Sequence, residues 1–164
     1  MRTWRRIGTV LAVVAALFAA GLVSATPAQA APYSFEAPGT SQNWNVFPTL
    51  CNGCSSGPVV RFWQMILYAD YGNNIGQSCS TFVDGVFGPN TTYWTKVWQQ
   101  ARGIGVDGVV GPQTWGKAQQ QRVFINYQAF VSHWRYDGSQ RDFHTSSIVT
   151  GTSTVWNFNT CTWL

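Results

Sequence analysis

Ionisable side chains are scarce in this sequence. Of its 164 residues, six are acidic, two are histidines and ten are Lys or Arg. Arg2, Arg5 and Arg6 supply three of the cations, so the chain from Ala31 onward holds seven cations against six acids, a net charge of +1. Binding to nucleic-acid phosphates requires a basic stripe, and the cations left are few and scattered. The composition therefore argues against nucleic acid as a partner.

The few acids are also poorly placed for catalysis. Asp84, Asp107 and Asp137 each precede a glycine, a pattern typical of turns in which the carboxylate accepts from the local backbone. The other acids are Glu36, Asp70 and Asp142. Glycoside hydrolysis requires two facing carboxylates, and this set does not suggest such a pair. We therefore expect a protein that is not an enzyme.

The two histidines belong to the only metal-ligating set that the sequence suggests. His133 and His144 flank the turn at Asp137-Gly138, so a hairpin could bring them together beside Asp142. No helical His-Glu-x-x-His spacing accompanies them, and a zinc hydrolase needs three protein ligands in a defined geometry. Surface or hydrogen-bonded histidines are the preferred interpretation, and we expect neither a metal nor a cofactor.

The first thirty residues have the pattern of an export signal. A basic start precedes an apolar run at residues 7–23, and Ala28-Gln29-Ala30 is a small-x-small cleavage site. A membrane anchor is the alternative, but the run is short and is interrupted by small residues. We expect a secreted, extracellular protein that begins near Ala31 after cleavage and has no stable membrane anchor.

All four cysteines follow this signal, at Cys51, Cys54, Cys79 and Cys161. An even number in an exported chain favours two disulfides. The alternative is half of a zinc site at Cys51-x-x-Cys54, but the sequence has no second Cys-x-x-Cys or His-x-His to complete it. The spacing leaves the pairing open; the arrangement we expect joins the segment before the first helix to Cys79 and to Cys161.

One eight-residue segment, here called the repeat motif, occurs twice. Asp84-Gly85-Val86-Phe87-Gly88-Pro89-Asn90-Thr91 recurs 23 positions later as Asp107-Gly108-Val109-Val110-Gly111-Pro112-Gln113-Thr114, with six of eight positions identical. Such repetition indicates one supersecondary unit used twice. We expect Asp-Gly to form a tight turn, the second glycine to adopt a conformation closed to other residues, and the proline to start a helix. The expected structural positions are Asp84, Gly85, Gly88, Pro89 and Thr91, and in the second copy Asp107, Gly108, Gly111 and Pro112.

Gly-Pro pairs introduce three predicted helices, which span residues 58 to about 71, 89–103 and 112–120. Apolar residues at spacings of three and four predict the side that each helix buries. The predicted inward residues are Val59, Phe62, Trp63, Ile66 and Leu67 in the first helix, Trp94, Val97, Trp98 and Ala101 in the second, and Trp115 and Ala118 in the third.

The rest of the chain predicts extended structure. Residues 31–57 are rich in Pro, Gly, Ser and Asn and form an extended leader, with Trp44, Val46 and Phe47 docking on the body. Period-two alternation predicts strands near residues 123–127, 130–136, 143–149 and 154–162. The predicted fold is α+β: a three-helix bundle at 58–120 and a small antiparallel β hairpin or meander at 121–164, packed on the helices or tied to them by Cys161.

The order of these elements resembles a known family, the peptidoglycan-binding-like domain. The residues that carry the resemblance are Val60-Arg61-Phe62-Trp63-Gln64-Met65-Ile66-Leu67, Val97-Trp98-Gln99 and both copies of the repeat motif. The family has a hydrophobic-Gln pair in helix one and an aromatic-Gln pair in helix two, which here are Trp63-Gln64 and Trp98-Gln99. The resemblance covers residues 58–120 and implies a three-helix module retained at the bacterial cell wall. The loop before Asp84 is longer than in the family and contains a cysteine.

The resemblance implies peptidoglycan as the ligand, through its glycan strand, its stem peptide or both. Eight tryptophans follow residue 30, beside abundant Tyr, Phe, Asn, Gln and Thr, which suit the apolar faces and neutral polar groups of a glycan. Tryptophans at helical spacing favour the core instead. The expected ligand-binding residues are Asn90, Tyr93, Gln113, Thr114, Trp134, Tyr136 and Trp156.

Two other functions stay open. One is a small cell-wall hydrolase with its site in the C-terminal extension, for which Asp142 and His144 are the first residues to test. The other is a secreted module that binds another protein or a polymer. In each case we expect a monomer.

Overall fold

A computed structural model describes residues 33–38, 43–128, 130–150 and 153–163. The predicted export signal, residues 1–30, lies outside these ranges. Within them, no helix combines the length and the apolar character needed to cross a membrane.

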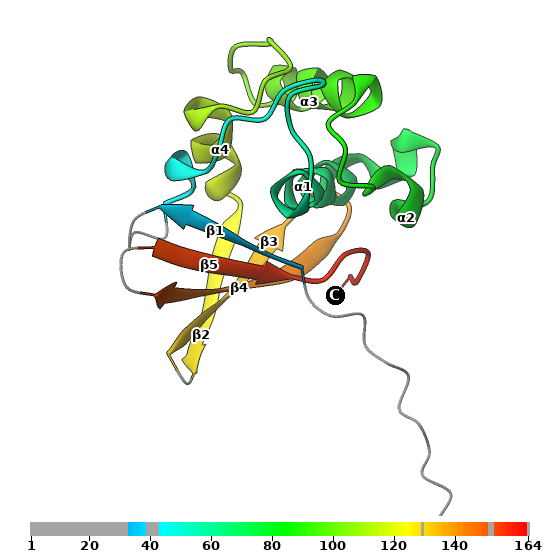
Figure 1. Cartoon of the computed structure of the whole chain (residues 1–164). Helices are drawn as coiled ribbons and strands as arrows, with labels where there is room; N and C mark the ends of the chain where they lie inside the picture. Colours follow the sequence, from blue (N-terminus) through cyan, green and yellow to red (C-terminus); the bar gives the residue numbers. More distant parts are fainter. Residues whose placement is uncertain (1–32, 39–42, 129, 151–152, 164) are drawn as a thin grey trace, which may run out of the picture.

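The molecule consists of helices packed on one face of an antiparallel sheet (Figure 1). The helices are the 3-10 turn η1 (Trp44–Val46), α1 (Pro58–Ile75), α2 (Cys79–Phe82), α3 (Pro89–Ala101) and α4 (Pro112–Gln119). The strands are β1 (Tyr33–Pro38), β2 (Arg122–Gln128), β3 (Val131–Asp137), β4 (Asp142–Thr150) and β5 (Ser153–Phe158). The predicted α+β class, with a helical region followed by an antiparallel sheet, is confirmed. Two of these helical elements were not predicted. The 3-10 turn η1 lies in the leader, which was expected to be extended. α2 lies in the loop before Asp84, where the Ser78 hydroxyl caps it by accepting from the Thr81 N–H.

Each of the three longer helices begins with proline after a glycine, as predicted. A proline at this position loses nothing, because the first N–H groups of a helix have no partner within it. α1 continues to Ile75, beyond its predicted end near Tyr71. Gly72 lies within the helix, where the side chains of Tyr68 and Arg141 occupy the space that a Cβ would take. The helix ends where Gly76 adopts a left-handed conformation with φ of 70°.

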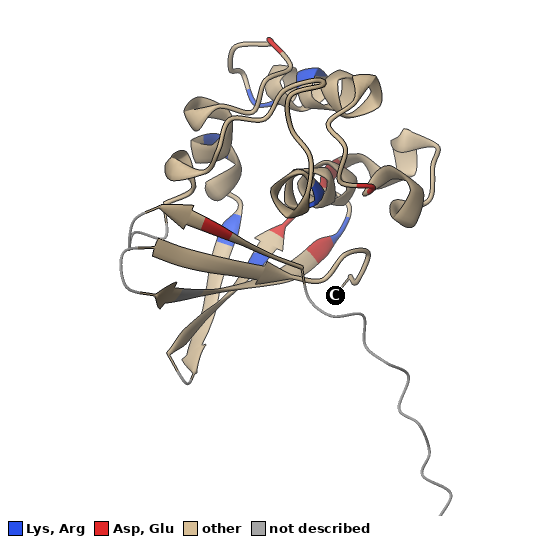
Figure 2. Cartoon of the chain, in the orientation of Figure 1, with Lys and Arg blue, Asp and Glu red and all other residues tan. Residues whose placement is uncertain are grey.

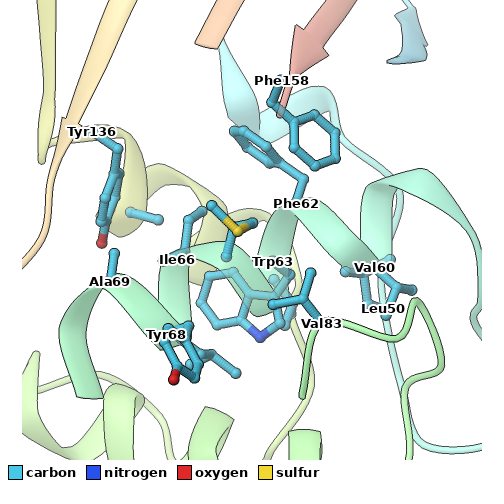
Figure 3. Packing of buried hydrophobic residues seen from close by; sticks show 14 of the residues in the cluster. Leu50, Val60, Phe62, Trp63, Ile66, Tyr68, Ala69, Val83, Tyr136 and Phe158 are labelled. Atoms are coloured by element: carbon cyan, nitrogen blue, oxygen red, sulfur yellow. The ribbon is translucent and has the colours of Figure 1, made fainter. Parts of the chain in front are cut away.

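α1 is the central element of the core (Figure 3). Every residue from Phe62 to Asp70 is buried, because the sheet covers one side of the helix while α3, α4 and the leader cover the others. On the sheet side, Phe62 packs against Phe158 with ring centres 5.1 Å apart. On the opposite side Trp63 meets Trp115 of α4 at 5.3 Å. Trp44 and Phe47 of the leader dock on this core as predicted, whereas Val46 is exposed.

The predicted inward face of α3 is wrong in part. Trp98 is buried, but Ala101 is exposed and Trp94 and Val97 are only half-buried. The face turned inward instead carries polar residues, which are Thr91, Thr95 and Gln99. These side chains make buried hydrogen bonds, among them one from the Trp63 indole to the Thr95 hydroxyl at 2.9 Å. Apolar spacing alone misses a helix face that is buried because it is fully hydrogen-bonded.

The sheet has the order β1-β5-β4-β3-β2 and is antiparallel throughout. β2 to β5 form the predicted meander. β1, which comes from the leader, was not predicted as a strand; it adds to β5 with Tyr33 opposite Phe158. The leader and the C-terminal extension therefore share one sheet, although more than 100 residues separate them.

Two disulfides, Cys51–Cys54 and Cys79–Cys161, leave no free cysteine in the described chain. The number of bridges agrees with the prediction, but the expected pairing is wrong. The Cys51 segment lies against the two copies of the repeat motif, where Leu50 exchanges backbone hydrogen bonds with Val110 at 2.9 and 3.1 Å. Cys79 is instead held next to the end of the chain, and its bridge ties α2 to the segment after β5.

A buried carboxylate joins the helices to the sheet. Asp70 of α1 is fully buried, and its Oδ2 accepts from Trp98 Nε1 (2.7 Å), Arg102 Nη2 (3.0 Å) and the Tyr136 hydroxyl (3.0 Å). Its Oδ1 accepts from the Ser139 N–H (2.7 Å) and hydroxyl (2.9 Å). Burial, reinforced by the charge of Asp70, raises the pKa of Tyr136 well above its ordinary value, so the phenol stays protonated as a donor. Five donors from α3, β3 and the turn after β3 thus converge on one helix residue.

Replacing Asp70 with alanine should strongly destabilise the protein. The substitution leaves the Arg102 guanidinium without its carboxylate and the buried Tyr136 hydroxyl without an acceptor, which we expect to cost about 3–5 kcal/mol of unfolding free energy. Asp142→Ala is the matched control: its carboxylate lies 3.7 Å from Arg135 on the surface, and such pairs contribute about 1 kcal/mol or less. Urea unfolding followed by tryptophan fluorescence measures both; equal losses would contradict the role of Asp70.

The two disulfides should differ in their contribution to stability. Cys79–Cys161 closes a loop with a sequence separation of 82, and Cys51–Cys54 one of 3. Loop-closure entropy predicts about 4–5 kcal/mol for the long loop and about 2 kcal/mol for the short one. The double variants C79S/C161S and C51S/C54S, compared by urea unfolding, test this order; a larger loss for C51S/C54S would contradict it.

Candidate functional site

Each copy of the repeat motif is held by a buried glutamine. In the first copy, the Gln64 carbonyl oxygen accepts from the Gly85 N–H at 2.8 Å. The Gln64 amide nitrogen lies within hydrogen-bonding distance of Asp84 Oδ1 (2.8 Å), the Val86 carbonyl (3.1 Å) and Thr91 Oγ1 (3.1 Å). Asp84 also accepts from the Val86 N–H at 2.8 Å, the local turn bond that its sequence context predicts. One side chain of α1 therefore fixes the whole turn and the start of α3.

Gln99 of α3 holds the second copy in the same way. It accepts from the Gly108 N–H at 2.8 Å and donates toward Asp107 Oδ1 (2.8 Å), the Val109 carbonyl (2.9 Å) and Thr114 Oγ1 (3.1 Å). The backbone bond from Val109, followed by the Gln99 bond, lowers the pKa of Asp107, so the carboxylate is ionised at neutral pH. Each hydrophobic-Gln or aromatic-Gln pair thus supports the copy that follows it in the chain.

The two glycines of each copy have different roles. The first glycine adopts the left-handed conformation, with φ of 80° at Gly85 and 76° at Gly108, which side chains rarely tolerate. The second glycine does not: Gly88 and Gly111 have φ near −100° and −98° in extended backbone. The expectation that the second glycine needs a special conformation is therefore wrong; the tight turn is made at the first.

A pocket of about 320 Å³ opens beside the first copy, between it and α2. Its wall mixes apolar groups with neutral amides and hydroxyls, and it contains a single charged side chain, that of Asp84. The Asn90 amide donates to Gln77 Oε1 at 2.8 Å and so links the two sides. The lining residues are Gln77, Thr81, Phe82, Asp84, Val86, Gly88, Pro89, Asn90 and Thr91. Three of them, Gln77, Thr81 and Phe82, come from the lengthened loop and α2. They were not predicted as site residues, and the unusual length of this loop was the only feature of the sequence that set the segment apart.

Three of the expected ligand-binding residues lie on the surface of the helical region. Asn90 lines the pocket, and Tyr93, on the same helix, is 60% exposed with its ring edge-on to Trp94. Gln113 is exposed at the start of α4, in the second copy. The positions of Asn90 and Gln113 are equivalent in the two copies, but only Asn90 belongs to this pocket. Their part in binding stays a prediction.

The other expected residues are less accessible. Thr114, Tyr136 and Trp156 are buried, so the expectation that they face a ligand is wrong. Thr114 is held by Gln99, Tyr136 donates to Asp70, and Trp156 packs in the aromatic core. Trp134 is half-buried beneath Arg122, whose guanidinium carbon lies 3.8 Å from the ring centre. Burial lowers the pKa of Arg122 to about 10, so this cation keeps its charge at neutral pH.

The candidate metal-ligating set of His133, His144 and Asp142, which the sequence suggested but did not favour, does not assemble. His133 and His144 do approach each other, since they line a common pocket of about 300 Å³ on the sheet with Thr145, Ser146, Asn157, Phe158 and Asn159. Asp142 does not line it and lies 3.7 Å from Arg135 instead. No group of three His, Cys, Asp or Glu side chains able to hold a metal occurs in the described part of the chain.

Comparison with known families identifies the helical region. Residues 56–117 match the family model described as "Putative peptidoglycan binding domain". The matched segment begins just ahead of α1, ends within α4, and includes both copies of the repeat motif and both supporting glutamines. The resemblance found in the sequence is confirmed over this segment. No curated protein and no solved structure matches the chain.

Replacing Gln99 with leucine should loosen the second copy. The change keeps the side-chain size but leaves the buried Gly108 N–H without its acceptor and removes the bond that Gln99 donates to the Thr114 hydroxyl, which we expect to cost about 2–4 kcal/mol. Gln100→Leu is the matched control, because Gln100 is the next residue of the same helix and is exposed; it should change stability by about 0.5 kcal/mol or less. Urea unfolding at neutral pH compares the two, and similar losses would show that the buried bonds do not matter.

Proposed function

We propose that this protein, which contains a peptidoglycan-binding domain at residues 56–117, is exported and binds the bacterial cell wall without cleaving it. The observation that carries the proposal is the pocket beside the first copy of the repeat motif. It lies within the matched segment and is built from residues that the fold holds in place.

Both walls of this pocket are fixed before any ligand arrives. On one side, Gln64 bonds to Asp84, Gly85, Val86 and Thr91 and so sets the turn and the first residues of α3. On the other side, the Cys79–Cys161 bridge anchors α2. A site whose groups are already in position loses little conformational entropy on binding. This favours a binding role for the pocket.

The chemistry of the pocket suits a neutral glycan with short peptides. Asn90 and Gln77 offer amides and Thr81 a hydroxyl, which can exchange hydrogen bonds with acetamido groups, hydroxyls and peptide bonds. Val86 is 55% exposed and, with Pro89, supplies apolar surface for a sugar face or a small stem-peptide side chain. Such contacts do not depend on long-range attraction, in keeping with the small net charge of the exported chain.

The acidic side chains are all occupied by structural hydrogen bonds or ion pairs, which supports a role without catalysis. All six acids of the exported chain lie among the described residues, and each accepts a hydrogen bond or faces a cation. Asp84 and Asp107 hold turns, Asp70 is saturated by five donors, and Glu36 accepts from Ser153 on the neighbouring strand. A general acid or nucleophile for glycan cleavage needs a carboxyl group directed at the substrate.

The residues 53–57, Gly53-Cys54-Ser55-Ser56-Gly57, have the Gly-x-Ser-x-Gly spacing of some hydrolases. The Ser55 hydroxyl nevertheless lies 3.3 Å from the Cys51 N–H and 3.5 Å from the Thr49 carbonyl, within its own loop. Both histidines are in β3 and β4 and line the pocket on the sheet. The serine thus has no histidine base beside it, which again favours binding over hydrolysis.

The peptidoglycan-binding domain and the two disulfides are consistent with a location outside the cytoplasm, at the cell wall. Export through the signal predicted at residues 1–30 would bring the protein there. In this proposal the protein needs no cofactor and no nucleic acid, and peptidoglycan is its partner.

The test is co-sedimentation of the purified mature protein with insoluble peptidoglycan. We expect the wild type to sediment at low and moderate salt, and Asn90→Ala to weaken binding by about three- to tenfold, since it removes one positioned hydrogen-bonding amide. Gln113→Ala is the comparison at the equivalent position of the second copy, which lies outside this pocket, and we expect it to weaken binding less than Asn90→Ala does.

Three outcomes would count against the proposal. Wild-type protein that stays in the supernatant would exclude wall binding. Loss of binding in Gln113→Ala but not in Asn90→Ala would move the site to the second copy. Release of soluble fragments, or a fall in turbidity of purified walls, would favour a hydrolase, and Asp142→Ala and His144→Ala would then locate its activity.

A further inference from the structure

β2 is an exposed edge strand. Among the residues that the structure describes, it pairs with β3 alone, and every residue from Val123 to Gln128 is exposed. In the described chain, five of the ten exposed large hydrophobic residues lie on β2 and on the turn that follows it. They are Val123, Phe124, Ile125, Tyr127 and Phe130. Native proteins seldom leave a long apolar strand edge open.

From Val123 to Gln128 this edge also has no charged side chain. No Asp, Glu, Lys or Arg occurs between Arg122 and Arg135, and Figure 2 shows that the end of the β2–β3 hairpin far from the helices is free of charged residues. Charged residues on edge strands keep two copies of a protein apart. The electrostatic barrier to a second copy is therefore absent along β2.

The opposite edge of the sheet shows the contrast. β1 is short, carries Glu36 and ends at Pro38, features that hinder the addition of another strand. Its residue Ala37 is also buried against the body. Of the two edges of this sheet, only β2 has a largely apolar stretch without charged side chains, from Val123 to Gln128; its one charged residue is Arg122, at the start of the strand.

In place of the monomer expected from the sequence, we propose that β2 pairs antiparallel with β2 of a second copy, about a two-fold axis at Ile125. Ile125 has no partner residue on β3, because the β2–β3 register shifts between Phe124 and Asn126. Pairing centred there sets Val123 opposite Tyr127 of the other copy, so apolar side chains meet. It also sets Arg122 opposite Gln128, so the two arginines lie at opposite ends of the interface.

A second β2 suits this edge better than a lipid surface does. Lipid would accept the apolar side chains, but the outward N–H and C=O groups of the strand would lack partners in hydrocarbon. A paired strand satisfies the backbone groups and covers the side chains together. The closed two-fold arrangement uses both β2 edges and leaves only the protected β1 edges outside. If the proposed wall binding holds, the dimer would carry two wall-binding sites and gain avidity.

Sedimentation velocity of the mature protein tests the dimer without using peptidoglycan. We expect the wild type to sediment at twice the monomer mass. Ile125→Lys sets two ammonium groups against each other at the axis and should raise the dimer dissociation constant by at least about tenfold. Val149→Lys is the matched control, since Val149 and Ile125 are both 44% exposed but Val149 lies on β4, away from the edge. Circular dichroism verifies that both variants fold.

Cross-linking tests the axis itself. An Ile125→Cys variant should form a covalent dimer on oxidation, because the two cysteines would face each other across the two-fold axis, whereas Val149→Cys should stay monomeric on a non-reducing gel.

Three results would overturn the proposal: a wild type that is monomeric at every concentration, equal weakening of the dimer by both lysine variants, or growth into open polymers. Monomers that bind phosphatidylglycerol vesicles would also overturn it, in favour of lipid. A dimer that fails to sediment with peptidoglycan would refute the proposed function and leave this inference standing.

Discussion

The carboxylate of Asp70 is the constraint on which the packing of this protein depends. A charge buried in the middle of a core helix is costly unless donors surround it, and here they come from α3, from β3 and from the turn after β3. The same turn contacts α1 a second time, where the Ala69 carbonyl accepts from the Gln140 and Arg141 N–H groups at 3.0 Å each. The helical region and the sheet are therefore locked together by directional bonds as well as by aromatic packing, which specifies one orientation of the sheet on the helices.

The repeated glutamine arrangement has a different consequence, because it makes a rigid surface from a loop. Gln64 and Gln99 each satisfy the backbone and side-chain groups of one turn, so the turns need no help from solvent and the helices after them start at fixed positions. Only the first copy is flanked by α2, which the long loop and the Cys79–Cys161 bridge place beside it. Two turns of the same construction thus face different surroundings, and this difference explains why we assign the binding pocket to the first.

The sheet divides into a part that the helices cover and a part that they do not. Tyr136, Phe143 and Phe158 lie against α1 and Trp156 lies against Trp44 and Phe47 of the leader, and all four are buried. β2, in contrast, extends past the helices and is exposed from Val123 to Gln128 (Figure 1). An apolar edge strand in that position is open to pairing with another strand, and covering it removes apolar side chains from water. The edge at β1 carries Glu36 and ends at Pro38, features that hinder strand addition.

The sequence by itself determined the local features of this protein. Gly-Pro pairs predicted where α1, α3 and α4 begin. The alternation after residue 120, with the turn at Asp137-Gly138, predicted the antiparallel strands β2 to β5. The repeat motif identified the peptidoglycan-binding domain, and each of these signals depends on neighbouring residues alone. Only the tertiary structure decided which side chains are covered. Trp156, Tyr136 and Thr114 look like residues of a binding surface in the sequence, but elements remote in the chain bury them. Asp70 and its donors, the disulfide pairing and the role of β1 were likewise undetermined, since their partners lie up to 125 residues away. Burial and long-range bonding depend on how the elements pack, and no local pattern encodes that packing directly.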